Sequence, residues 1–532
     1  MKNKHNQLLV YIFLFLIAFF PRAINPVAAP IHWFWRPLQF YRALVTGNLD
    51  STFQSGHPGV TVMWLSGFSE SIYREITGFP ASLDPSDVLP MYYISPSAIL
   101  SGLLPLVFLI SLGVCLTYFL LSKLFNREIA LLASIFIALD PFYLYQSKIL
   151  HLDATLANLM MLSALSFLVF MKEKDRKYLI ASAILGGFAL LTKTPAIFLI
   201  PFVALSLLVF NWIELNESIK QRTYNSFFVI FKPFFYYSLV LGLVFFLAFP
   251  AFWVSPIATF QKIFALGVKK PITAPHGYQN YFLGEILVLK HIGLKFYLLT
   301  AAFFSTPLTL LSYITGFIYL FQKRIQKEQR VYALLIFLYS IFFLIMVSIA
   351  AKNGIRYLAP FFPMFSIFSA LGFYWFYKSI VDFVKIKVKI DIRKSVFFVC
   401  FILLLNFFPV VKRYPYFGTY YNPLLGGAKS ASFVFPLGDQ AEGVDQALKY
   451  IDEVEENPEN LRIGCDTPLA CIQHTKGMVL DIDDETADYL VFLRNKVIRQ
   501  TNKKTWDIYK DQVPEKVISF DEIPYVWVYK AI

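Results

Sequence analysis

Residues 95–121 read SPSAILSGLLPLVFLISLGVCLTYFLL and contain no charged side chain. A helix needs about 20 mostly apolar residues to cross a bilayer, so this stretch predicts a transmembrane helix. Ten further apolar segments follow the same pattern: 7–25, 128–147, 153–171, 178–192, 195–212, 232–253, 296–321, 331–350, 357–377 and 395–411. The chain is therefore expected to be an all-α polytopic membrane protein with about eleven spans. The first span lacks a cleavage-site pattern and is interpreted as an anchor.

Composition supports this class and excludes two others. Of the 532 residues, 57% are hydrophobic and only 16% are charged, whereas soluble domains carry about 25% charged residues. Aromatic residues make up 18%, which excludes a disordered chain. Residues 1–411 have a net charge of +18 and residues 412–532 a net charge of −5. The basic excess lies in the membrane part, so it indicates topology rather than a nucleic-acid partner.

Short basic connections set the expected orientation. With the N-terminus in the cytoplasm, the inner connections are short and basic, as in the run 172–177, and the outer connections are longer and less basic. Eleven spans then place the C-terminal part outside. We expect a multi-pass protein of the cell (inner) membrane with two domains: a membrane domain, 1–411, and an extracytoplasmic domain, 412–532.

The C-terminal part reads as a small α/β domain. A helix is expected over 440–456, and short strands are expected at 461–464, 478–482, 489–494 and 525–529. Cys465 and Cys471 can pair if this domain lies outside the cytosol. The acidic run 481–485 fits either a weak divalent-cation site or a solvated loop, and no cofactor is otherwise indicated.

Two long outer loops, 26–94 and 254–295, are candidates for function because long loops are rarely simple connectors. The first contains Asp50 and His57, which suit a general base or a metal ligand, or else a solvated acid and a loop-capping imidazole. The second contains His276 and Glu285, which either contact substrate or belong to a loop packed on the membrane interface.

The remaining candidates lie at the outer ends of spans, where charged groups usually face a cavity. Asp153 begins the fourth span, and it is expected either to cap that helix or to face the cavity. Lys193 interrupts an apolar stretch, which fits either snorkelling or phosphate binding. Lys352 and Arg356, with the adjacent Tyr357, are the best candidates for an anionic ligand, because guanidinium binds phosphate through a planar fork.

An ordered set of short motifs resembles the bacterial branch of the protein O-mannosyltransferase family, in the glycosyltransferase C superfamily. Aminoarabinose transferases of lipid A are more distant relatives. The matching pieces are HPGVTVMW (57–64), HLDA (151–154), TKTP (192–195), FLGE (282–285), RYLAP (356–360), YNPLLGG (421–427) and EGVDQA (442–447).

This resemblance implies an enzyme that takes a sugar from a polyprenyl-phosphate carrier at the outer leaflet and passes it to a protein or another envelope acceptor. It implies a single inverting displacement, in which an acid deprotonates the acceptor while cations hold the departing lipid phosphate. Arg356 and Lys193 become the phosphate-binding candidates, and Asp153 matches the family's second acidic position.

The sequence departs from the family at one point. The acidic pair that follows the family's first span falls here on Ala29 and Pro30, and neither residue accepts a proton. Two readings follow: either Asp50 replaces the base, assisted by His32 or His57, or the chain is a non-catalytic relative that binds a lipid-linked glycan or a partner. A transporter is less favoured, because no internal repeat is present.

Overall fold

The computed structural model describes residues 2–26, 32–78, 95–212, 216, 224–273, 279–288, 292–322, 325–387 and 392–531. Six of the described helices are long and apolar enough to cross a bilayer, and eight spans result if each of two bent pairs counts as one. The chain is thus a multi-pass helical membrane protein, as predicted. The six helices are α1 (Lys2–Ala23), α4 (Pro96–Leu124), α7 (Leu152–Glu173), α11 (Tyr224–Leu247), α17 (Lys327–Ser348) and α18 (Phe361–Lys387).

Each of the eleven predicted segments is mainly helical, but four of them are interrupted, two of these at a sharp bend. Helices α5 (Arg127–Leu139) and α6 (Pro141–Ser147) meet at 55°, where Asp140 caps α6 ahead of Pro141. The expectation of one continuous span over 296–321 is wrong, because α15 (Leu294–Phe304) and α16 (Pro307–Leu320) meet at 118°. The other segments form α8 (Arg176–Thr192), η3 (Thr194–Phe198), α9 (Leu199–Phe210) and α19 (Ile392–Val411). The total of eleven spans stays a prediction.

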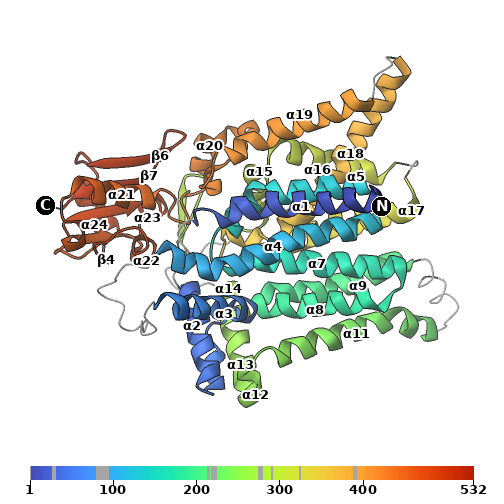
Figure 1. Ribbon diagram of the computed structural model, residues 1–532, viewed down its shortest axis with the longest axis horizontal. Coiled ribbons are helices and arrows are strands. Elements are labelled where there is room, and N and C mark those ends of the chain that lie inside the picture. The colour runs from blue at the N-terminus through green and yellow to red at the C-terminus, as the bar shows by residue number, and fades with distance from the viewer. Residues whose placement is uncertain are drawn as a thin grey trace.

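Helix α7 forms the centre of the bundle. Every residue from Leu152 to Met171 is buried, because neighbouring helices cover all its faces. In Figure 1 the long helices lie side by side, and the N-terminal end of α1 is at the opposite end of the bundle from the C-terminal domain. This arrangement agrees with an odd number of spans, while the assignment of the two ends to cytoplasm and exterior stays a prediction.

Short elements collect at the end of the bundle nearest the C-terminal domain (Figure 1). They come mainly from the two long loops. These elements are α2 (His32–Val45), η1 (Leu49–Thr52), α3 (Val60–Thr77), α12 (Ala251–Val254), α13 (Pro256–Ile263), the π-helical turn η4 (Phe264–Lys269), α14 (Lys270–Thr273), β1 (Gln279–Phe282) and β2 (Glu285–Val288). The β1–β2 hairpin was not predicted, and its turn donates backbone hydrogen bonds from Leu283 and Gly284 to carbonyls of the C-terminal domain.

The C-terminal domain contains a five-stranded sheet in the order β4-β3-β5-β7-β6, in which β3 is parallel to β4 and β5, and β7 is antiparallel to its neighbours. Four of the strands were predicted: β3 (Arg462–Cys465), β4 (Met478–Asp481), β5 (Tyr489–Leu493) and β7 (Ile523–Lys530); β6 (Lys516–Phe520) was not. The predicted helix at 440–456 is α21, which is shorter (Val444–Val454). The further helices are α20 (Gly427–Val434), α22 (Pro468–Cys471), α23 (Arg494–Ile498) and α24 (Lys503–Tyr509). Cys465 and Cys471 form a disulfide.

Candidate active site

A buried ion pair forms the centre of the site. Asp153 lies in the first turn of α7, where the helix dipole favours an anion. Lys193 lies in the extended residue between α8 and η3, and its Nζ is 2.5 Å from Asp153 Oδ1. The two side chains are only 1% and 4% exposed. Because charges this deeply buried are costly unless paired, the two residues must be considered as one unit.

Two further residues surround the second oxygen of this carboxylate. His151 Nδ1 is 2.9 Å from Asp153 Oδ2, and Arg356 Nε is 4.0 Å from the same oxygen. Arg356 Nη1 also lies 3.4 Å from His151 Nε2. Burial lowers the pKa of His151 to about 4, so the imidazole is neutral at pH 7. In a neutral ring with its proton on Nδ1, Nε2 can accept a hydrogen bond from Arg356.

Loop 53–59 brings a second imidazole to the same place. The Thr194 hydroxyl donates to the Gly267 carbonyl, and His57 Nδ1 lies 3.1 Å from that hydroxyl oxygen. The loop packs closely on η4, since a Cβ on Gly56 would lie 2.2 Å from the Leu266 Cβ. Burial and the charge of Lys193 lower the pKa of His57 to about 3. His57 is therefore neutral and fixed at the edge of the site.

A cavity of about 270 Å³ opens beside the ion pair. Its lining is partly polar and partly apolar, and the apolar residues come mainly from η3, η4, α14 and the end of α17. The polar lining residues are His57, Asp153, Lys193, Thr194, Lys352 and Tyr357; the apolar ones include Ile197, Val268, Ile272, Met346, Val347 and Ile349.

The charged side chains at the cavity include more positive than negative groups. Lys193, Lys352 and the adjacent Arg356 face a single carboxylate among the lining residues, that of Asp153. Lys193 Nζ also lies 4.9 Å from the centre of the Tyr357 ring. The cavity is therefore suited to an anion.

The structure does not bring every candidate residue to this cavity. Asp50 is exposed in η1, where it accepts a hydrogen bond from Ser255, and Glu285 is exposed at the start of β2. His276 lies outside the described residues, as do Ala29 and Pro30, and the side chain of His32 is not described. Among the described residues, no group of three or more His, Cys, Asp or Glu is arranged to hold a metal ion.

Two contributors were missed as site residues. His151 is two positions from Asp153 in the sequence, and its place at the helix start was the available signal. Glu442 of the C-terminal domain is 2% exposed and lies beside Tyr145 of α6. Asp439, in the same loop, adds to the electrostatic field at Arg356. The C-terminal domain is therefore close enough to Arg356 for Asp439 to affect the charge environment there.

These observations define a multi-pass membrane protein with a cation-rich cavity at one end of its helix bundle. Residues 91–237 match the family model described as dolichyl-phosphate-mannose-protein mannosyltransferase. This match confirms the family resemblance for the part of the chain that contains Asp153 and Lys193. No curated protein matches the chain.

Several solved structures align with the chain. ArnT from Cupriavidus metallidurans bound to undecaprenyl phosphate is 13% identical, with a TM-score of 0.48, over 98% of this chain and 97% of that chain. The archaeal oligosaccharyltransferase AglB from Archaeoglobus fulgidus, in complex with an inhibitory peptide and a dolichol-phosphate, is 13% identical, with a TM-score of 0.48, over 92% and 69%. The S. cerevisiae protein O-mannosyltransferase complex Pmt1–Pmt2, bound to the sugar donor, is 20% identical, with a TM-score of 0.38, over 53% and 39%.

Proposed function

We propose that this protein is a hexosyltransferase that moves a sugar from a polyprenyl-phosphate carrier to a protein or glycolipid hydroxyl at the outer leaflet. One observation carries the proposal: cationic and apolar side chains line a single cavity. A lipid-linked phosphate has both of these properties. The family match over residues 91–237 supports the same reading.

The cationic side chains suit the phosphate diester of the donor. Lys193 is already partly neutralised by Asp153, so further positive charge comes from Lys352, which lines the cavity, and from Arg356, which lies beside Asp153. Arg356 is 38% exposed at its side chain, which leaves its guanidinium accessible. Charge-assisted hydrogen bonds from such groups to phosphate are about twice as strong as neutral ones.

The apolar lining suits the isoprenoid chain. Ile197, Ile272 and Ile349 line the cavity and are also 50–64% exposed. Exposed isoleucines at the end of a membrane helix bundle face lipid, so the apolar lining continues from the cavity to the bilayer. The carrier can therefore enter sideways, with its chain left in the membrane and its phosphate at Arg356.

The reaction follows from this placement. The acceptor oxygen attacks the anomeric carbon from the side opposite the phosphate, the bond from that carbon to the phosphate oxygen breaks, and the lipid phosphate leaves with the electron pair. The acceptor proton passes to a base. Among the lining residues, His57 and Asp153 are the proton acceptors. A bound phosphate compensates the charge of Lys193, which raises the pKa of His57 and makes it a better base.

The test is transfer of labelled sugar from polyprenyl-phosphate mannose or glucose in proteoliposomes. Lys193→Gln and Arg356→Ala should each lower the rate by about 100-fold or more, because they remove charge that stabilises the leaving phosphate. Lys429→Ala is the matched control, since it removes a charge from an exposed position on α20. Equal rates in the three variants and the unmodified protein would refute the site.

A second candidate function is binding without transfer. The observation in its favour is that Asp153 is paired to Lys193 while Asp50 lies outside the cavity. This reading expects the donor to bind with no turnover against any acceptor. Measurable turnover by the unmodified protein would exclude it, whereas donor binding that depends on Arg356 without turnover would establish it.

A further inference from the structure

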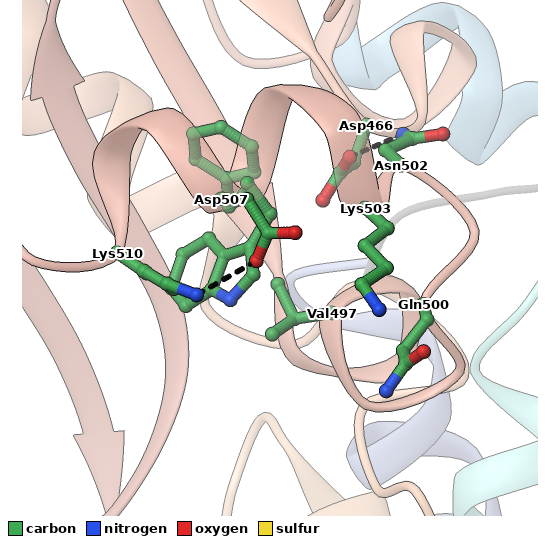
Figure 2. Close-up of a pocket in the computed structure, with 9 residues that line it drawn as sticks. Asp466, Val497, Gln500, Asn502, Lys503, Asp507 and Lys510 are labelled. Atoms are coloured by element: carbon green, nitrogen blue, oxygen red, sulfur yellow. Dashed lines mark hydrogen bonds and ion pairs between the residues drawn. The ribbon is translucent and has the colours of Figure 1, made fainter.

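A second cleft lies in the C-terminal domain, away from the cavity beside Asp153. Helices α23 and α24 border it together with the ends of β3 and β5, and its volume is about 180 Å³. Figure 2 shows two interacting pairs in it, Asp466 with Asn502 and Asp507 with Lys510, with Lys503 and Gln500 beside them. The lining residues are Asp466, Phe492, Val497, Gln500, Asn502, Lys503, Trp506, Asp507 and Lys510.

The charges in this cleft balance. Two lysines and two aspartates line it, and Lys510 Nζ lies 2.9 Å from Asp507 Oδ1. A phosphate or carboxylate ligand would meet the carboxylates of Asp466 and Asp507, and a cationic ligand would meet Lys503 and Lys510. A neutral ligand avoids repulsion from both the carboxylates and the lysines. It can satisfy these groups if it both donates and accepts hydrogen bonds.

The amide of Asn502 is held in place. Asp466 is 6% exposed, and its carboxylate accepts a hydrogen bond from the Asn502 side chain and another, at 2.8 Å, from the Leu493 backbone N–H. The disulfide at Cys465 fixes the backbone directly before Asp466. A polar group fixed in this way loses little conformational freedom when a ligand binds.

An aromatic side chain supplies the apolar side of the cleft. Trp506 is half-buried, and its ring centre is 5.2 Å from that of Phe492 and 5.3 Å from that of Trp527. The ring is therefore held by packing with part of its surface open. An aromatic surface beside a few fixed polar groups is the usual composition of a small-molecule site.

The backbone at the edge of the cleft is also unusual. Gln500 has φ = 55°, in the left-handed region that costs a residue with a Cβ free energy. Hydrogen bonds from the backbone N–H groups of Gln500 and Thr501 to the carbonyls of Val497 and Lys496 hold this turn. The turn directs residue 500 to the cleft, so the residue with the strained backbone also lines the cleft.

We propose that this cleft binds one neutral, hydroxyl-rich sugar unit. Hydroxyls pair with the Asn502 amide, the Gln500 amide, the Lys503 ammonium group and the Asp507–Lys510 pair. The C–H face of the sugar covers Trp506. The cleft binds sugar independently of catalysis; its role as a subsite for a glycan-bearing acceptor rests on the proposed transferase function.

The experiment is saturation-transfer NMR on the full chain in lipid nanodiscs, with methyl α-mannoside, methyl β-glucoside and inorganic phosphate as separate probes. A neutral glycoside should bind, and phosphate should not compete with it. Gln500→Gly and Lys503→Ala should each weaken the glycoside by about fivefold or more, since each removes a hydrogen-bonding side chain. Lys504→Ala is the matched control, because residue 504 is exposed but does not line the cleft.

Three results would overturn the proposal: no binding of any neutral glycoside, displacement of the glycoside by phosphate, or equal binding in the unmodified chain and both cleft variants. Gln500→Gly keeps the left-handed turn, so loss of folding does not obscure that outcome. Measurements on the unmodified chain separate the two hypotheses. Glycoside binding without any transfer keeps the cleft and removes the transferase; transfer without glycoside binding does the reverse.

Discussion

The cavity beside Asp153 and the cleft beside Trp506 are both built from charged and apolar side chains, but they balance charge differently. In the cavity, Lys193, Lys352 and Arg356 face one carboxylate, so positive charge remains. In the cleft, two lysines are matched by two aspartates. We infer that a partly buried site with unbalanced charge favours a ligand of opposite charge. A site with balanced charge favours a neutral ligand that forms hydrogen bonds.

The two sites also differ in how the chain builds them. The cavity uses the ends of membrane helices, with Asp153 at the start of α7 and Lys193 at the end of α8. The cleft uses a short turn around Gln500 and two small helices. Changes in the cavity should therefore affect the stability of the whole bundle, while changes in the cleft should stay local.

The largest effect is expected from Asp153→Asn. The substitution leaves Lys193 buried without its carboxylate, and breaking such a pair costs about 3–5 kcal/mol. Thermal unfolding in detergent should show a large fall in midpoint. The double variant Asp153→Asn with Lys193→Met should recover much of it, because it removes the uncompensated charge.

An exposed ion pair at the other end of the bundle gives the matched control. Asp175 and Lys177 pair at 2.6 Å, but their side chains are 41% and 66% exposed. Asp175→Asn should leave the unfolding midpoint nearly unchanged, because solvent screens an exposed pair. If both substitutions lower the unfolding midpoint by a similar amount, the Asp153–Lys193 pair must be hydrated. The buried and exposed pairs would then not differ in their effect on stability.

The fold of the membrane part could largely be predicted, because apolar length and helix formation are tied in a bilayer. All eleven segments are mainly helical. The sharp bend before Pro307 was missed, although Thr306 caps α16 and Pro307 is at its first position, a readable start signal. The signal was missed because the segment was interpreted by its apolar composition over its whole length. Strand β6 was missed because a short strand with Lys516 at its start resembles surface loop.

The site could be predicted only in part. The Asp153–Lys193 contact joins residues 40 positions apart, and no local pattern specifies that distance. The family resemblance named both residues without placing them together. Asp50 and His57 are close in sequence, yet the turn at Leu49–Thr52 directs Asp50 to Ser255 while His57 reaches Thr194. Closeness in sequence therefore did not predict that the two side chains are separated by a turn of the chain.

A medium effect is expected from pH, with opposite signs for His57 and Glu442. The pKa of His57 is lowered to about 3 by burial and by Lys193, so the unfolded chain binds this proton more readily below pH 6.5. Stability from His57 is present above that pH and is lost as pH falls to 5, by about 1–2 kcal/mol. Burial raises the pKa of Glu442 to about 7, so its contribution is lost as pH rises from 5 to 7.5.

The check is the unfolding midpoint measured at pH 5, 6 and 7.5. His57→Gln should reduce the loss of stability toward acid, and Glu442→Gln should reduce the loss toward neutral pH. His474→Gln tests whether another histidine, of the C-terminal domain, contributes to the acid side, since burial lowers its pKa as well. If the unfolding midpoint changes with pH in the same way in the His57 and Glu442 variants, the two residues do not have opposite effects on stability.

The smallest effect is expected from Asp50→Asn. Asp50 is exposed, and its contact is with the Ser255 hydroxyl, a partner that an amide can keep. Transfer should stay within about twofold of the unmodified rate, and stability should change by no more than about 0.5 kcal/mol, as for most surface substitutions. His57→Gln, measured beside it, should lower transfer strongly, because His57 lines the cavity. If Asp50→Asn instead removes transfer as fully as Lys193→Gln, then donor binding must draw the turn at Leu49–Thr52 into the cavity. Asp50 would then be the base, and the cavity would gain the second carboxylate that its excess of positive charge lacks.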